Sequence, residues 1–179
     1  MIGYACINME LRGQNIFTNR TLRKATLLDK GYDYLCELII ANLEDLKSIL
    51  QWNEDNNHKF FRISSEIFPF WSHPELGYEL EDLPESETIL KLLSEIGLFA
   101  LEYNHRITTH PGPFNVLASP NQEVVLKAIK ELDCHSKMFN YMGFKPSHYN
   151  KINIHVGGAY GEPLEALNIV FPNKVFGSD

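Results

Sequence analysis

Short strand-like runs alternate with longer segments of helical periodicity, and this alternation is the strongest constraint on the fold. Apolar residues repeat at three- and four-residue steps from Leu35 to Leu50 and from Ile89 to Ala100, as in amphipathic helices. Strict alternation of strand and helix predicts parallel strands joined by right-handed crossovers. The four strand-like runs, each ending in polar or glycine-rich sequence, are Ile2–Asn8, Lys59–Ser65, Arg106–His110 and Lys151–Gly158.

The third helical segment carries the clearest boundary signals. Ser119 is expected to cap the helix, with Pro120 at its first position and Gln122 completing a capping box. Apolar residues then mark one face from Val124 to Met142, and Gly143 suits the end of the helix. The sequence therefore predicts three long helices, one between each pair of successive strands.

Two architectures fit this pattern, a doubly wound open sheet and a (β/α) barrel. No G-x-G-x-x-G motif follows the first run, so the dinucleotide-binding open sheet lacks its best support. Barrel enzymes assemble their active sites at the carboxyl ends of the strands, which favours the barrel. The polar residues at the four strand ends are Asn8, Ser64 and Ser65, His110, and His155.

The length of the chain limits how much of a barrel it can form. A complete (β/α)₈ barrel typically needs about 250 residues, whereas this chain has 179. The sequence therefore predicts a single domain over residues 1–179 that forms roughly half a TIM-like barrel. Its four parallel strands are expected in the order 1-2-3-4, with the helices outside. The inward strand faces should include Tyr4, Phe61, Ile107 and Ile154, or their immediate neighbours.

Composition narrows the function classes. A net charge of −7 argues against a sequence-independent DNA coat, which carries a basic stripe, but not against an enzyme whose metal ions supply positive charge locally. A small cluster of Arg20, Arg23 and Lys24 is interpreted as a solvated helix face, with phosphate contact as the alternative. Three widely spaced cysteines, and the lack of a secretory signal or a long apolar window, predict an intracellular protein, cytoplasmic or nucleoid-associated, with no membrane partner.

Two of the seven histidines stand out, because His110 and His155 end strands and precede Pro-Gly and Val-Gly-Gly. Neutral imidazole is a common ligand of divalent metals, and a rigid strand end fixes its direction, so metal binding and a structural role are equal alternatives here. His73, in "FWSHPELGY", either orients a substrate phosphate or anchors a loop. The histidines expected to be structural are His58, His105, His135 and His148.

The motifs together resemble the UV-damage endonuclease family. "GYACINMEL", "TNRT", "WNEDNNHKFFRISSEIFPFWSHPELGY", "HPGPF", "SPNQEVV" and "INIHVGGAYGE" stand in that family's order, from the first residue to about Glu162. The resemblance implies the N-terminal portion of a metal-dependent barrel, in the superfamily of the apurinic endonucleases and xylose isomerase. It also implies an enzyme that nicks damaged double-stranded DNA 5′ to UV photoproducts and other distorting lesions. The cofactors it implies are divalent metal ions, with manganese the usual candidate.

The resemblance also implies roles for individual residues. His110 and His155 look like ligands of the most exposed metal ion, and His73 looks like the catalytic histidine that contacts the scissile region. Tyr4 and Asn8 look like residues that shape the damage pocket.

After "HPG" the family typically has Gln and then an aromatic residue, which probe the bases opposite the lesion. Here Pro113 stands at the Gln position, whereas Phe114 keeps the aromatic ring. Pro163 likewise stands where the family often has Lys.

The later strands of the family, which bring the bridging carboxylates, have no counterpart in this sequence. A separate chain is therefore an expected partner, supplying the missing C-terminal half. Two alternatives stay open beside a truncated or split endonuclease. One is a non-catalytic damage-binding or structural remnant of the family. The other is a different metal-dependent barrel enzyme, an apurinic endonuclease or a sugar isomerase.

Overall fold

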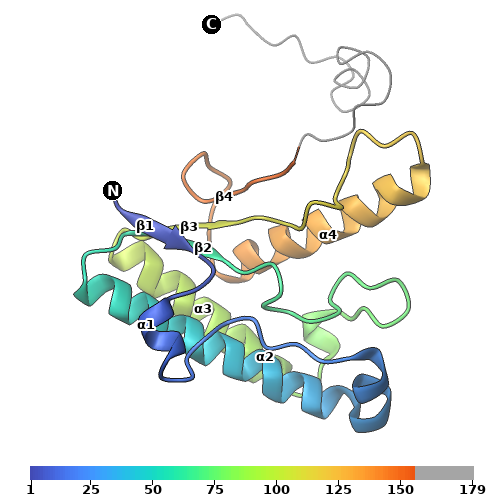
Figure 1. Ribbon diagram of the computed structural model, residues 1–179, viewed down its shortest axis with the longest axis horizontal. Coiled ribbons are helices and arrows are strands. Elements are labelled where there is room, and N and C mark those ends of the chain that lie inside the picture. The colour runs from blue at the N-terminus through green and yellow to red at the C-terminus, as the bar shows by residue number, and fades with distance from the viewer. Residues whose placement is uncertain (156–179) are drawn as a thin grey trace, which may run out of the picture.

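A computed structural model describes residues 1–155 of the chain, and Figure 1 shows its arrangement. Long helices lie against one side of a small sheet, and the other side of the sheet carries no helix from this part of the chain. In chain order the elements are β1 (Gly3–Ala5), α1 (Met9–Arg12), α2 (Lys24–Asp55), β2 (Phe60–Ile63), the 3₁₀ helix η1 (Leu80–Asp82), α3 (Ser86–Glu102), β3 (Arg106–Thr109), α4 (Gln122–Tyr141) and β4 (Lys151–Ile152).

The sheet has the predicted topology, since its four strands are parallel and lie in the order β1-β2-β3-β4. Each strand is shorter than the sequence pattern indicates, because the polar residues at its carboxyl end leave the ladder. After β1, for example, Cys6 adopts a positive φ of 62° and turns the chain away. The end of the fourth expected strand, from residue 156 to 158, lies outside the described residues.

The helix-facing side of the sheet holds three of the residues expected to point inward. Tyr4, Phe61 and Ile107 are register partners on β1, β2 and β3, and Phe61 and Ile107 are fully buried. The Tyr4 hydroxyl donates to Asn53 Oδ1 of α2 at 2.5 Å, which shows that this row faces the helices. The inward side is therefore formed by their immediate neighbours, the other form of the prediction, because large apolar side chains bury more surface against the helix layer than on an uncovered face.

The opposite side, which we call the open face, is formed by their immediate neighbours. Side chains alternate along a strand, so Ala5, Arg62, Thr108 and Lys151, which share one register row, point away from α2 and α3. Arg106, two residues before Thr108 on β3, lies on the same face. Apart from Phe60, which shares the row of Arg106, charged and small side chains occupy this face, in contrast to the largely apolar helix side.

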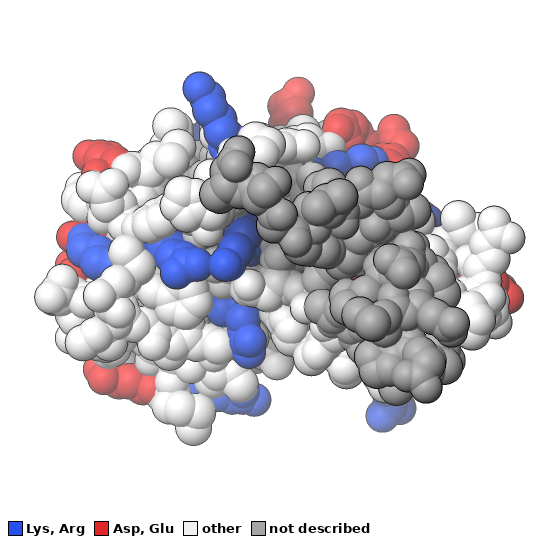
Figure 2. All heavy atoms as spheres, turned by 90° about the horizontal axis from the view of Figure 1, so that it is seen from above, with Lys and Arg blue, Asp and Glu red and all other residues white. Residues whose placement is uncertain are grey.

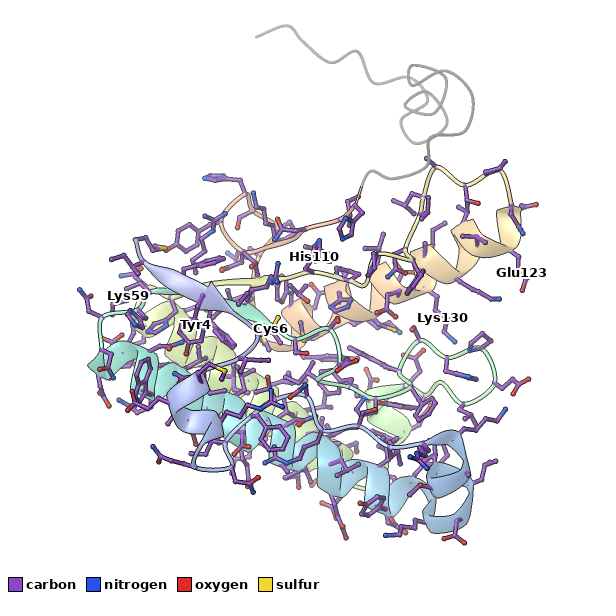
Figure 3. The ribbon with its side chains drawn as sticks, in the orientation of Figure 1. Tyr4, Cys6, Lys59, His110, Glu123 and Lys130 are labelled. Atoms are coloured by element: carbon purple, nitrogen blue, oxygen red, sulfur yellow. The ribbon has the colours of Figure 1, made fainter. Side chains whose placement is uncertain are left out.

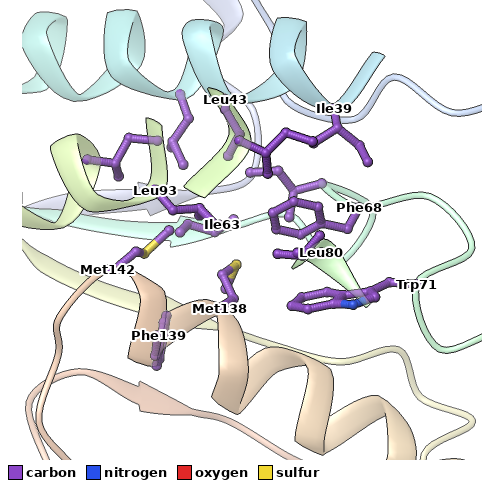
Figure 4. Packing of buried hydrophobic residues seen from close by; sticks show 14 of the residues in the cluster. Ile39, Leu43, Ile63, Phe68, Trp71, Leu80, Leu93, Met138, Phe139 and Met142 are labelled. Carbon is purple, nitrogen blue, oxygen red and sulfur yellow. The ribbon is translucent and has the colours of Figure 1, made fainter. Parts of the chain in front are cut away.

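The core lies between the sheet and the helices, and Figure 4 shows its packing. Each large aliphatic side chain buried there contributes about 1.5–3 kcal/mol relative to exposure. The cluster joins α2, α3, the end of α4, β2 and the loop after β2 into one apolar unit. Residues that represent these elements are Ile39, Leu43, Ile63, Phe68, Trp71, Leu80, Leu93, Met138, Phe139 and Met142.

The start of α4 corrects one sequence expectation. The N-cap is Asn121, whose side chain accepts from the Glu123 N–H at 2.9 Å, and the helix begins at Gln122. Ser119 does not cap the helix, because its hydroxyl oxygen accepts from the Asn121 N–H at 3.2 Å. Because of that local turn, Pro120 lies ahead of the helix and Asn121 is the N-cap. Asparagine is also a favourable N-cap residue.

Two glycines shape the helices through positive φ. Gly143, with φ 76°, follows α4 and ends it as predicted. Gly31, with φ 73°, breaks the helical geometry inside α2 and kinks it near its start. Within residues 1–155, no helix combines the length and the apolar character needed to cross a membrane.

Candidate functional site

The carboxyl ends of β3 and β4 bring the two strand-terminal histidines together. His110 directly follows β3, His155 stands three residues beyond β4, and their ring centroids are 4.5 Å apart at an interplanar angle of 54°. Strand alternation directs both toward the open face, and Figure 3 places His110 above the sheet. Two imidazoles at this separation can direct nitrogen atoms toward one ion.

The surroundings of His110 favour the neutral form of its imidazole. Burial lowers the pKa of His110, and the nearby His155 and Arg62 lower it further by charge repulsion. Neutral imidazole carries the free lone pair that a metal ion requires, whereas imidazolium does not. The site therefore favours the protonation state in which His110 can act as a ligand.

The donor set around this pair is incomplete within the described part of the chain. No group of three or more His, Cys, Asp or Glu side chains in residues 1–155 is arranged to hold a metal ion. A hard divalent cation such as manganese prefers oxygen ligands, and a nuclease cluster needs bridging carboxylates. His110 and His155 could supply two ligands of such a site, and residues 1–155 hold no third His, Cys, Asp or Glu placed to join them.

His73 lies in the loop between β2 and η1, with its ring orientation fixed by the backbone. Its Nδ1 accepts from the N–H groups of Glu75 at 3.1 Å and Leu76 at 3.2 Å. Because Nδ1 accepts, the ring proton of the neutral form resides on Nε2. Phe70 packs edge-on against the ring, and the Gly77 N–H donates to the His73 carbonyl at 2.8 Å. The loop therefore presents His73 as a hydrogen-bond donor through Nε2.

We expect nitrogen NMR to find this tautomer in the folded chain. In long-range ¹H–¹⁵N spectra above pH 8, His73 should show a protonated Nε2 and an unprotonated Nδ1. The exposed His148 is the control and should average between tautomers. Gly77→Ala should release the ring, because the added Cβ would lie 2.6 Å from the His73 carbonyl oxygen. A protonated Nδ1 on His73 would contradict the assignment.

A hydrogen-bonded network on α4 links the segments that carry these histidines. Thr109 Oγ1 and His135 Nδ1 are 2.9 Å apart, His135 Nε2 lies 3.4 Å from Glu131 Oε1, and Ser72 donates to Glu131. Although burial opposes it, the bonds from His135 and Ser72 hold the pKa of Glu131 below its ordinary value. Ser72 directly precedes His73, and Thr109 directly precedes His110. The network therefore holds both segments against α4, which agrees with the structural role expected of His135.

A cleft of about 640 Å³ opens between the loop after β2, the loop after β3 and α4. His73, Glu131 and Lys127 line it, and so does Phe114. The Phe114 side chain is 89% exposed, an unusual position for a large aromatic ring. Pro113 is exposed beside it. The cleft thus joins a polar wall to a free aromatic face.

Tyr4 and Asn8 lie near the carboxyl end of β1, where Figure 3 labels Tyr4. Asn8 Nδ2 donates to the Tyr4 hydroxyl at 2.8 Å, and Asn8 Oδ1 accepts from the Leu11 N–H at 3.0 Å as the N-cap of α1. Burial raises the pKa of the Tyr4 phenol. Both side chains have internal partners, so their contact with a lesion stays a prediction.

The basic cluster near the start of α2 is mostly neutralised. Arg20 pairs with Asp45 at 2.6 Å, and Lys24 pairs with Glu75 at 2.6 Å. These ion pairs agree with the expectation that the cluster does not bind phosphate, but Arg20 precedes α2 and its side chain is only 18% exposed, so it is not part of a solvated helix face.

Sequence reasoning missed Glu131 and Arg62. Glu131 could have been found from its four-residue spacing to His135, which places both side chains on one face of a helix. The signal for Arg62 was a charged residue inside the otherwise apolar strand "FFRI".

Comparisons with known proteins agree on one family. The chain matches the family model described as UV-endonuclease UvdE over residues 1–174. It is 40% identical over 166 residues to a putative UV-damage endonuclease of Acanthamoeba polyphaga mimivirus, covering 93% of this chain and 49% of that protein. It is 37% identical over 172 residues to the UV-damage endonuclease of Schizosaccharomyces pombe, covering 93% and 28%.

The fold agrees as well. The crystal structure of SacUVDE superposes with a TM-score of 0.83 at 33% sequence identity, covering 96% of this chain and 54% of that one. This supports half of a TIM-like barrel, with parallel strands in sequential order and helices outside. The chain spans about half or less of the length of the relatives it matches. On these matches, the chain belongs to the UV-endonuclease UvdE family.

Proposed function

We propose that the chain is the N-terminal portion of a DNA repair endonuclease that nicks damaged double-stranded DNA 5′ to UV photoproducts and other distorting lesions. The reaction is a metal-dependent hydrolysis of a phosphodiester bond. The observation that carries this proposal is the pairing of His110 and His155 at the strand ends, in a chain of this family. Damaged DNA is the substrate and the principal partner.

Each histidine has a distinct task in this reaction. His110 and His155 hold part of the metal site, with manganese the expected ion. When bound, divalent ions supply a hydroxide nucleophile near neutral pH and a shield for developing charge. The Nε2–H of His73 donates a hydrogen bond to an oxygen of the scissile phosphate. This bond orients the phosphate and stabilises negative charge on it.

The lesion is read by weakened stacking. A nucleotide leaves the helix most cheaply where damage has already disrupted pairing, and an exposed aromatic ring can take the vacated position. Phe114 offers such a ring at the mouth of the cleft. Pro113 cannot replace the amide hydrogen bonds of the glutamine typical at its position, so stacking carries the recognition at this loop.

Phe114→Ala is expected to weaken binding to a lesion-containing duplex by about 1–3 kcal/mol through lost stacking. Fluorescence anisotropy with matched damaged and undamaged duplexes measures the effect. Pro113→Gln is the companion variant and should leave binding unchanged or improve it. Equal affinity of the wild type and the folded Phe114→Ala variant would remove the stacking role and leave Phe114 as a loop residue.

The rest of the metal site must be supplied by polypeptide beyond the described residues, either a continuation or a separate chain that provides the C-terminal half. A non-catalytic damage-binding protein is the second candidate function, because only two ligands converge in residues 1–155. Nicking of UV-irradiated DNA by the completed protein separates the two candidates. Cleavage supports the endonuclease, whereas binding without cleavage supports the alternative.

A further inference from the structure

Two polar atoms on the open face are buried without a hydrogen-bond partner in the described part of the chain, and they belong to neighbouring residues. Arg62 Nε on β2 and Thr108 Oγ1 on β3 are both in this condition, and Arg62 and Thr108 are register partners. Buried polar groups in native proteins nearly always have partners. Leaving one unpaired costs about 1–3 kcal/mol, and more when it is charged. This row is therefore shaped for a group that residues 1–155 do not supply.

The adjacent Thr109 shows what a satisfied threonine looks like in the same strand. Thr108 and Thr109 are 1% and 0% exposed. Thr109 faces the helices and its hydroxyl lies 2.9 Å from His135 Nδ1, whereas the Thr108 hydroxyl faces the open side and has no hydrogen-bond partner among residues 1–155. The two hydroxyls are equally buried and differ in the side of the sheet that they face.

The open face also has an excess of positive charge. Among the described residues seven Lys and Arg side chains form ion pairs with carboxylates. Arg62, Arg106 and Lys151 on the open face form none with any residue in this range. Figure 2 looks down on this side and shows Lys and Arg in a band across the described surface, with Asp and Glu toward its edges.

A carboxylate fits this row best. The guanidinium presents a planar fork of N–H donors that matches the two oxygens of a carboxylate, and a threonine hydroxyl can donate a further bond. A DNA phosphate has similar chemistry, but DNA would meet the strand ends, where His110 and His155 lie. Arg62 and Thr108 lie two residues deeper along their strands. At that depth the opposite wall of a closed barrel is the nearest source of an anion.

We propose that the open face docks the C-terminal portion of a UV-damage endonuclease and that Arg62 and Thr108 bind a carboxylate which that portion presents. The inference rests on the proposed completion of the barrel. The partial match to SacUVDE supports it, because this chain covers only 54% of that protein. It assigns a specific acidic contact to the interior of the assembled protein, two residues below His110 on the same sheet.

The first test uses the 179-residue chain alone. Thr108→Val removes an orphaned hydroxyl and should raise the thermal midpoint by about 2–4 °C. Thr109→Val is the matched control, because it removes a bonded hydroxyl at equal burial and should lower the midpoint. A lowered midpoint for Thr108→Val would show that the hydroxyl already has a partner in this chain and would overturn the proposal.

The second test joins this chain to the remaining C-terminal portion of SacUVDE in one polypeptide. There Thr108→Val should lower the thermal midpoint, and Arg62→Met should lower it further, because the carboxylate loses its partners. The readout is stability, so a failure to nick DNA leaves this result intact. The same sign for Thr108→Val in both proteins would overturn the proposal.

A DNA-binding measurement on the lone chain distinguishes a phosphate from a carboxylate. Arg62→Met should change affinity for a UV-irradiated duplex by less than twofold, whereas the Phe114→Ala variant weakens it. A tenfold loss on Arg62→Met, without a sign reversal for Thr108→Val in the fusion, would identify DNA phosphate as the partner and reject the docking surface.

Discussion

Purified alone, the 179-residue chain is expected to leave UV-irradiated plasmid DNA intact in the presence of Mn²⁺. Two imidazoles, from His110 and His155, make a weak site for a hard cation, and no third donor joins them within residues 1–155. Glu162, which from the sequence alone is a poor substitute for a bridging carboxylate, lies outside the described residues. Conversion of supercoiled plasmid to the nicked form, with and without Mn²⁺, measures the activity. Metal affinity followed by calorimetry should be correspondingly weak.

Addition of the C-terminal half of a related enzyme, in one polypeptide or as a separate chain, should restore nicking. In the restored protein His110→Ala or His155→Ala should abolish nicking, with a loss of activity of at least about 100-fold. Loss of a residue that merely supports a metal ligand already costs about 10–100-fold, and loss of a ligand itself should cost at least as much. His148→Ala is the control, because His148 is exposed and away from the paired rings. Robust Mn²⁺-dependent nicking by the chain alone would contradict this account and would assign the missing carboxylates to a second copy or to residues of this chain.

The fold could be predicted from the sequence because its signals are local. Each strand is a short run that ends in polar or glycine-rich sequence, and the apolar residues of each long helix repeat every three or four positions. The order and direction of the strands therefore follow from the alternation of strand and helix. The pairing of His110 and His155 was predictable for the same reason. Both end neighbouring parallel strands, and the ends of such strands lie on one rim.

The remaining features depend on tertiary contacts that no local pattern encodes. Ser119 and Asn121 are both good caps, and the turn that decides between them forms only in the folded chain. Whether Tyr4 faces the helices or the barrel interior depends on Asn53, which lies 49 residues away. The two adjacent threonines look alike in the sequence, but among the described residues the Thr109 hydroxyl has a hydrogen-bond partner and the Thr108 hydroxyl has none. Alternation gives the two faces of a strand, but not which face is covered.

Gly97→Ala is expected to cause the largest loss of stability of any single methyl added to this protein's described helices. Gly97 lies on α3 where the helix crosses the end of α4. An added Cβ would stand 1.7 Å from the Met142 carbonyl oxygen and 2.5 Å from its carbon, both backbone atoms. A flexible side chain could move aside, but here α3 and the backbone at Met142, which is buried among core residues, must separate.

That separation should also reach the site. The segment after α4 leads to Asn150, whose Oδ1 accepts from the Ile107 N–H at 2.9 Å, and then to β4 and His155. Displacement of this segment should loosen the alignment of β4 with β3 and spread the histidine pair.

We expect Gly97→Ala to lower the free energy of unfolding by about 3 kcal/mol, the upper end for overpacking in a core. Because a domain is stable by only about 5–15 kcal/mol, urea denaturation should show a large shift of the midpoint. Gly112→Ala is the matched control. Its Cβ would meet no heavy atom within 4 Å, and its φ lies outside the left-handed region, so its effect should stay within about 0.5 kcal/mol. Equal midpoints for the two variants would mean that α3 and the end of α4 are not in the close contact that positions β4.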